Sequence, residues 1–64
     1  MTELASNLLE YVHAHNSEEY KLSSVPKQRF AEIDAFTELA EMNYITFDAY
    51  FRDGVAYVKA TLLF

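Results

Sequence analysis

Residues 44–64 contain the feature that most constrains the fold, an Asp53-Gly54 pair between two runs of alternating apolar and polar residues. A two-residue type I′ turn needs positive φ at both central positions, and Asp-Gly adopts this turn readily. If these two residues form the loop, Arg52 pairs with Val55 and the register of the whole β-hairpin follows. The other expected pairs are Phe51–Ala56, Tyr50–Tyr57, Ala49–Val58, Asp48–Lys59, Phe47–Ala60, Thr46–Thr61 and Ile45–Leu62.

This register separates the side chains of the hairpin into two faces, because successive residues of a strand point to opposite sides of the sheet. The outer face carries cross-strand couples that stabilise antiparallel pairing, such as Asp48 with Lys59 and Tyr50 with Tyr57. The inner face is entirely apolar, and we expect a layer of helices to cover it. Its residues are Ile45, Phe47, Ala49, Phe51, Ala56, Val58, Ala60 and Leu62.

The length of 64 residues predicts a single domain, residues 1–64, with a small core. A chain of this size buries only about 60% of the surface that it exposes when unfolded. Small domains often gain stability from disulfides or metal ions, but this sequence has no Cys and only two His. Its hydrophobic residues, 52% of the chain, are expected to supply that stability, with association into a dimer as the other common remedy.

The sequence predicts a cytoplasmic protein. The absence of Cys fits a reducing compartment, and the first residues lack the basic and apolar regions of a signal peptide. No apolar run approaches the roughly 18 residues that a membrane-spanning helix needs, so we expect no contact with a membrane.

Residues 2–15 are predicted to form an amphipathic helix. Thr2 is a suitable N-cap, and Asn16 can adopt the left-handed conformation after the last turn. The apolar stripe of this helix comprises Leu4, Ala5, Leu8, Leu9 and Val12. After the helix, residues 20–22 alternate between apolar and polar, which allows either a short third strand beside the hairpin or a loop.

Within residues 26–43 the apolar residues recur every three positions. They are Phe30, Ile33, Phe36, Leu39 and Met42. Each step of three turns about 300° around a helix, so the stripe shifts by about 60° per step and one straight helix could not bury all five against one partner. We therefore predict two shorter helices, 26–33 and 35–42, that meet at Asp34, with one bent helix as the alternative. Asn43 is expected to end the second helix.

The predicted order of elements is helix, short strand, helix, turn, helix and a hairpin with a glycine at its tip. Together with the segment AFTELAEMNYI at 35–45 and the Asp53-Gly54 tip, this order resembles that of the winged helix-turn-helix superfamily. The resemblance implies an α+β fold in which two or three helices pack on a C-terminal β-hairpin or three-stranded sheet. It also implies a regulatory protein that contacts DNA through its recognition helix, 35–42, with Asn43 where these proteins usually have Gly.

The charge of the chain opposes the DNA contact that the resemblance implies. Ten acidic and five basic residues give a net charge of −5, whereas binding to phosphates depends on Lys and Arg. The predicted recognition helix contains no Lys or Arg, although Arg, Lys, Asn and Gln are the residues that mainly contact base edges. DNA binding by a dimer is therefore an alternative hypothesis, with Lys27, Arg29, Arg52 and Lys59 as the contact residues.

No group of residues predicts catalysis, a cofactor or a metal site. His13 and His15 lie two positions apart on a helix and point about 200° away from each other, so they cannot bind one metal ion. The acidic residues within 32–41 are expected to be exposed carboxylates, without the burial or charge partners that general acid–base chemistry needs. We therefore expect a protein that is not an enzyme and binds no small-molecule substrate.

The outer face of the hairpin is the candidate functional surface. Tyr is enriched at the centres of protein interfaces, although tyrosines also suit exposed strands by propensity. The expected contact residues are Tyr44, Tyr50, Val55, Tyr57 and Leu63. We predict a non-catalytic regulatory binding module of winged-helix type that acts through contacts with a protein partner or as a homodimer.

A further alternative is an acidic decoy that occupies the nucleic-acid groove of another protein. This hypothesis depends on a negative ridge along the helical segment. The ridge comprises Glu32, Asp34, Glu38 and Glu41.

Overall fold

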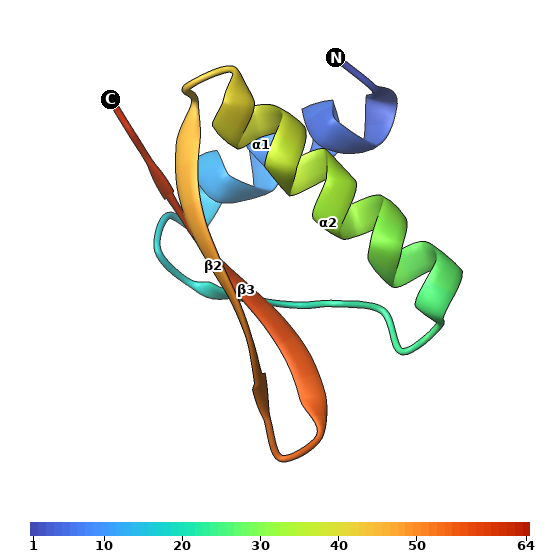
Figure 1. The fold of residues 1–64 in the computed structure, drawn as a ribbon. Helices are drawn as coiled ribbons and strands as arrows, with labels where there is room; N and C mark the ends of the chain where they lie inside the picture. Colours follow the sequence, from blue (N-terminus) through green and yellow to red (C-terminus); the bar gives the residue numbers. More distant parts are fainter.

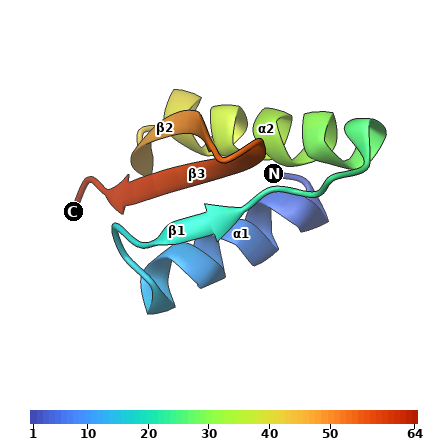
Figure 2. The same cartoon turned by 90° about the horizontal axis from the view of Figure 1, so that it is seen from below.

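Two helices and three strands make up the computed structural model, which describes all of residues 1–64 (Figure 1). In chain order they are α1 (Glu3–Ala14), β1 (Glu19–Lys21), α2 (Pro26–Glu41), β2 (Ile45–Arg52) and β3 (Val55–Leu62). The strands form one antiparallel sheet in the order β1-β3-β2 (Figure 2). The α+β class predicted from the sequence is therefore confirmed.

The β2–β3 hairpin has the predicted register at every position. Arg52 pairs with Val55 beside the turn, and Ile45 pairs with Leu62 at the other end. Asp53 and Gly54 have φ angles of 54° and 76°, as a type I′ turn requires. The turn residues and the alternation of side chains thus specify the same pairing.

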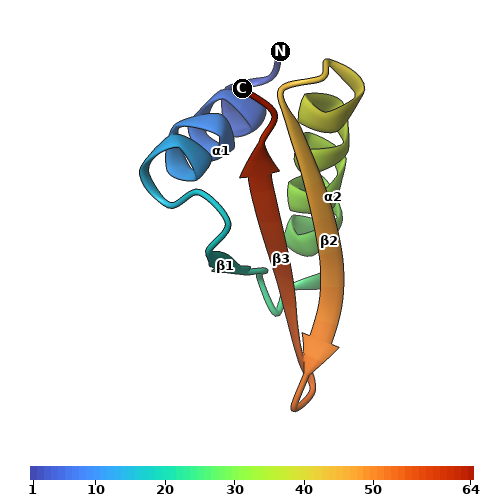
Figure 3. The ribbon, with the colours of Figure 1, turned by 90° about the vertical axis from the view of Figure 1, so that its left-hand side faces the viewer.

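The segment after α1 forms a short strand rather than a loop. β1 runs antiparallel to β3, with Tyr20 opposite Val58 and Lys21 opposite Tyr57. Tyr20 packs against the core, so its neighbours Glu19 and Lys21 point to the outer face. β3 is the central strand, and β2 forms one edge of the sheet (Figure 3).

α1 begins at its predicted N-cap. The Thr2 hydroxyl accepts a hydrogen bond from the Ala5 backbone N–H at 3.1 Å, and the predicted apolar stripe supplies buried residues to the core. The prediction for Asn16 is wrong, because Ser17 is the residue with positive φ, 64°. Asn16 instead accepts a hydrogen bond from the Leu62 backbone N–H with its side-chain oxygen, at 2.8 Å. This bond attaches the end of α1 to β3.

α2 is one continuous helix, so the prediction of two helices that meet at Asp34 is wrong. That prediction assumed that every apolar residue of the stripe must be buried. The structure buries Phe36 completely but leaves Phe30 64% exposed and Met42 43% exposed. Because both ends of the stripe face solvent, one helix can carry the three-residue spacing. The left-handed residue predicted after the helix is present, since Asn43 has a φ of 62°.

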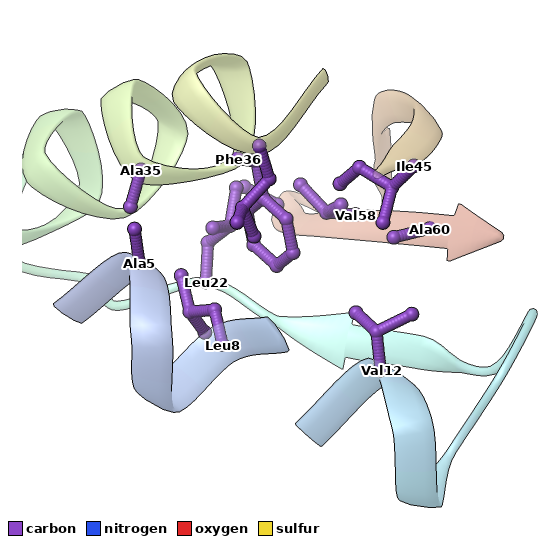
Figure 4. Packing of buried hydrophobic residues seen from close by; sticks show 11 residues of the cluster. Ala5, Leu8, Val12, Leu22, Ala35, Phe36, Ile45, Val58 and Ala60 are labelled. Atoms are coloured by element: carbon purple, nitrogen blue, oxygen red, sulfur yellow. The ribbon is translucent and has the colours of Figure 1, made fainter. Parts of the chain in front are cut away.

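The core lies between the two helices and one face of the sheet (Figure 4). Phe36 projects into it from α2, and the ring centroids of Tyr20 and Phe47 lie 5.5 Å and 5.8 Å from its own. The residues of the core are Ala5, Leu8, Val12, Leu22, Ala35, Phe36, Leu39, Ile45, Ala56, Val58 and Ala60. Both helices therefore pack on the same face of the sheet.

The half of the hairpin next to its turn extends beyond both helices (Figure 1). Phe51 is 73% exposed and Ala49 is also exposed, although both point to the predicted inner face. The expectation that helices cover the whole inner face is therefore wrong for these two residues of β2, whereas their partners Ala56 and Val58 on β3 are buried.

Candidate protein-contact surface

Two tyrosines from neighbouring strands stack on the outer face of the sheet. Tyr50 and Tyr57 form a cross-strand pair, their ring centroids are 5.9 Å apart, and both side chains are half-buried. The guanidinium carbon of Arg52 lies 4.5 Å from the centroid of the Tyr57 ring, which is a cation–π contact. We call these three residues, together with Glu19, the tyrosine cluster.

Glu19 joins the tyrosine cluster from β1. Its carboxylate accepts hydrogen bonds from the Arg52 guanidinium and from the Tyr50 hydroxyl. These two bonds, first that of Arg52, hold the pKa of Glu19 below its usual value, because they favour the charged carboxylate. The bond to Glu19 in turn raises the pKa of Tyr50. Glu19 is not among the contact residues predicted from the sequence, because its position depends on the register of β1 against β3.

We expect Arg52→Ala to raise the pKa of Glu19, and Tyr50→Phe to raise it by less, because the bond from Arg52 is the larger cause. The lowered pKa means that the cluster stabilises the fold above the ordinary value of 4.5 and that this contribution is lost as the pH falls through the folded pKa. NMR titration of the Glu19 carboxyl carbon measures the change. A control variant, Lys27→Ala, removes a positive charge elsewhere and should leave the midpoint in place. Equal titration midpoints of Glu19 in the wild-type protein and all three variants would contradict the two hydrogen bonds to Glu19.

Two of the predicted contact residues lie far from the tyrosine cluster. Tyr44 comes six residues before Tyr50, about 20 Å along the strand, and packs against the core and against Phe64, with ring centroids 6.1 Å apart. Leu63 is 51% exposed and donates its backbone N–H to the Tyr44 carbonyl at 3.1 Å. Only Val55, half-buried beside the turn, lies at the same end as the cluster. The predicted surface therefore consists of two patches at opposite ends of the hairpin.

A groove lies between the projecting half of the hairpin and the first turns of α2, and we call it the apolar groove. Phe51 of β2 and Phe30 of α2 line it and are among the most exposed apolar residues of the chain. Its volume is about 280 Å³, and Arg29 is its one residue that is not hydrophobic. The full lining is Leu22, Arg29, Phe30, Ile33, Ala49, Tyr50, Phe51, Ala56 and Tyr57. The sequence analysis had assigned the apolar residues of β2 and α2 to the core.

The four basic residues considered for DNA contact lie on two sides of the sheet. Lys27 and Arg29 are near the start of α2, on the side of the helices, and Arg29 lines the apolar groove. Lys59 points to the outer face, where Arg52 is bonded to Glu19. No single surface therefore presents all four residues together.

Glu32 is buried, not exposed as predicted. It is 5% exposed, and its two carboxylate oxygens accept hydrogen bonds from the Tyr20 hydroxyl at 2.6 Å and from the Ser23 backbone N–H at 2.7 Å. Burial, followed by this bond to Glu32, raises the pKa of Tyr20 to about 12. Glu32 thus attaches β1 and the loop after it to α2, and it does not belong to an exposed acidic ridge.

No family model, curated protein or solved structure matches the chain. No group of three or more His, Asp or Glu side chains is placed to hold a metal ion. Neither helix has the length and apolar character needed to cross a membrane. The tyrosine cluster and the apolar groove are therefore the features from which a function can be inferred.

Proposed function

We propose that this chain is a non-catalytic binding module that acts through protein contacts made by the projecting half of its hairpin. The observation that carries the proposal is the apolar groove, where Phe51 and Phe30 face solvent from two different elements. Full burial of such a side chain contributes about 1.5–3 kcal/mol, so an apolar partner group gains free energy by filling the groove. Contiguous exposed apolar surface is a common feature of protein interaction sites.

The tyrosine cluster supports the same proposal from the outer face. Aromatic residues and Arg are enriched at interface centres, where they contribute much of the binding free energy. The hydrogen bonds from Tyr50 and Arg52 to Glu19 order these side chains before any partner binds. A preorganised surface loses less side-chain entropy on binding. The hairpin tip, which carries one of these surfaces on each of its two faces, is the proposed contact region.

The proposal includes a regulatory role of winged-helix type, because the order of the elements resembles the order in that superfamily. The first helix, the short strand and a hairpin with Gly54 at its tip keep the order on which that resemblance is based, with the single helix α2 in place of its helix, turn and helix. α2 is continuous where a helix-turn-helix motif has a turn, so we assign the role to protein contact and not to a DNA-recognition helix. Neither DNA binding nor the acidic decoy has a supporting observation of similar strength, because the basic residues are divided between two sides and Glu32 is buried.

Site-specific photo-cross-linking tests the proposed function. Phe51 is replaced by the photoreactive analogue benzoyl-phenylalanine, which keeps an aromatic group at the groove, and the protein is irradiated in the cells that produce it. We expect covalent adducts between this position and a protein, identified by mass spectrometry, because the groove is the contact site.

The matched control places the same photoreactive residue at Glu10, on the exposed side of α1. Adducts should form at position 51, and the yield of adducts at position 10 should be at least about tenfold lower. Equal yields at the two positions, or no protein adduct at position 51, would contradict the proposed function.

A further inference from the structure

The outer edge of β2 carries backbone groups that no neighbouring strand binds. The Ala56 and Ala60 carbonyls of β3 accept hydrogen bonds from Leu22 N–H at 2.9 Å and Ser17 N–H at 2.8 Å, on the side of β1. Groups that point toward β1 cannot also pair with β2, because the backbone of an antiparallel strand faces its two neighbours alternately. The residues of β2 opposite these alanines therefore direct their N–H and C=O groups to the free edge. They are Phe51 and Phe47. Ala49, which lies two positions from each of them, directs its backbone groups to the same edge.

This edge lacks the features that usually prevent strand pairing. β2 has eight residues, contains no Pro, and keeps an unbroken register with β3, so it has no bulge. Proteins commonly protect exposed edges with Pro, bulges, short strands or several charges. The opposite edge of the sheet is much shorter, since β1 has only three residues. β2 is thus a long, regular template on which another strand can pair.

The charges of β2 are self-complementary. Asp48 and Arg52 are its only charged residues, and they stand two positions before and two positions after Tyr50. An antiparallel pairing of two β2 strands about a two-fold axis at Tyr50 places Asp48 of each copy opposite Arg52 of the other. Asp48 takes part in none of the ion pairs within one chain, whereas Arg52 pairs with Glu19 of its own chain. Opposite charges across an antiparallel pair are stabilising.

The same axis also agrees with the backbone and with the sizes of the side chains. It pairs Ala49 of one copy with Phe51 of the other, and both residues direct their backbone groups to the free edge. A small residue therefore faces a large one on the inner side of the sheet, the side that carries the apolar groove. The pairing covers Phe51, which is 73% exposed in the single chain.

We infer that the partner of this surface is a second copy of the chain, bound by antiparallel pairing of the two β2 strands about Tyr50. The two three-stranded sheets then join into one continuous sheet, in a dimer whose interface is the same on both copies. This inference rests on the proposed function and names the partner for the contact region. Charge complementarity along the strand identifies the partner as a second copy.

Sedimentation equilibrium with charge-reversed variants tests the inference. Wild-type protein should form dimers. Asp48→Lys and Arg52→Glu, each alone, should weaken the dimer by about tenfold or more, because each change places two like-charged pairs opposite each other. An equimolar mixture of the two variants should regain association, since every opposed pair then joins opposite charges. Glu10→Lys, an equal charge change on α1, should leave the dimer intact.

The mixture separates pairing from damage to the fold, because a purely structural effect in each variant would persist when the two are combined. A wild-type chain that stays monomeric up to millimolar concentration would overturn the inference, as would a mixture that fails to associate. Adducts with a different protein at position 51, found together with a monomeric wild-type chain, would leave the proposed function standing and overturn only the strand pairing.

Discussion

Phe36→Ala should remove a large part of the stability of the fold. Phe36 is completely buried and contacts residues from both the sheet and the helical layer. Loss of a buried Phe costs about 3–5 kcal/mol, because apolar burial is lost and a cavity remains. A domain of 64 residues has a total stability of only about 3–10 kcal/mol. Urea denaturation followed by circular dichroism should show a midpoint shifted strongly toward lower urea.

Phe51→Ala is the matched control, since it makes the same chemical change at a residue that is 73% exposed. In dilute, monomeric protein its effect on the free energy of unfolding should be within about 0.5 kcal/mol, as for most surface substitutions. A loss of stability equal to that of Phe36→Ala would show that Phe51 is part of the monomer core, contrary to the structure.

The hairpin could be predicted residue by residue because its determinants are local. Asp53-Gly54 sets the turn, and a shift of one position would move every apolar side chain to the other face. How much of the inner face of the hairpin the helices bury could not be predicted in this way. Whether Ala49 and Phe51 are buried depends on where α2 and α1 end relative to the hairpin, and no local pattern in β2 carries that information.

The error in α2 has a related cause. The sequence analysis treated Phe30 and Met42 as core residues because they continue a regular apolar spacing, and it added a bend at Asp34 to bury them. The structure instead leaves both exposed, Phe30 on an unbroken helix and Met42 at the C-cap of that helix. Apolar residues spaced three apart shift in position around a helix, and this shift already indicated that the ends of the stripe face solvent.

The two carboxylates with structural roles could not be identified from spacing. Glu19 meets Arg52 and Tyr50 only through the pairing of β1 with β3, and Glu32 meets Tyr20 and Ser23 only because a loop returns to α2. Such contacts join distant parts of the chain. Charged residues are seldom fully buried, so an expectation of exposure for Glu32 followed the general tendency.

Glu32→Ala should lower the free energy of unfolding by about 2–3 kcal/mol, because it removes two charge-assisted hydrogen bonds and leaves their donors without a partner in the fold. Those donors are the Tyr20 hydroxyl and the Ser23 backbone N–H. Urea denaturation at pH 7 measures the loss. Glu41→Ala removes an equal charge from an exposed position at the negative end of α2, where the change should be within about 0.5 kcal/mol. Equal effects of the two substitutions would contradict the structural role of Glu32.

The same substitution should change the response to high pH. The pKa of Tyr20 is raised from 10.0 to about 12, by burial first and then by Glu32, so the fold favours the neutral hydroxyl. This contribution to stability is present below pH 10 and is lost as the pH rises to about 12. Without Glu32 the pKa of Tyr20 should fall, and the decline of stability between these values should become shallower. Ultraviolet titration of tyrosinate, compared with Tyr20→Phe to assign the signal, follows this residue directly, and an unchanged Tyr20 midpoint in Glu32→Ala would show that the hydrogen bond does not control it.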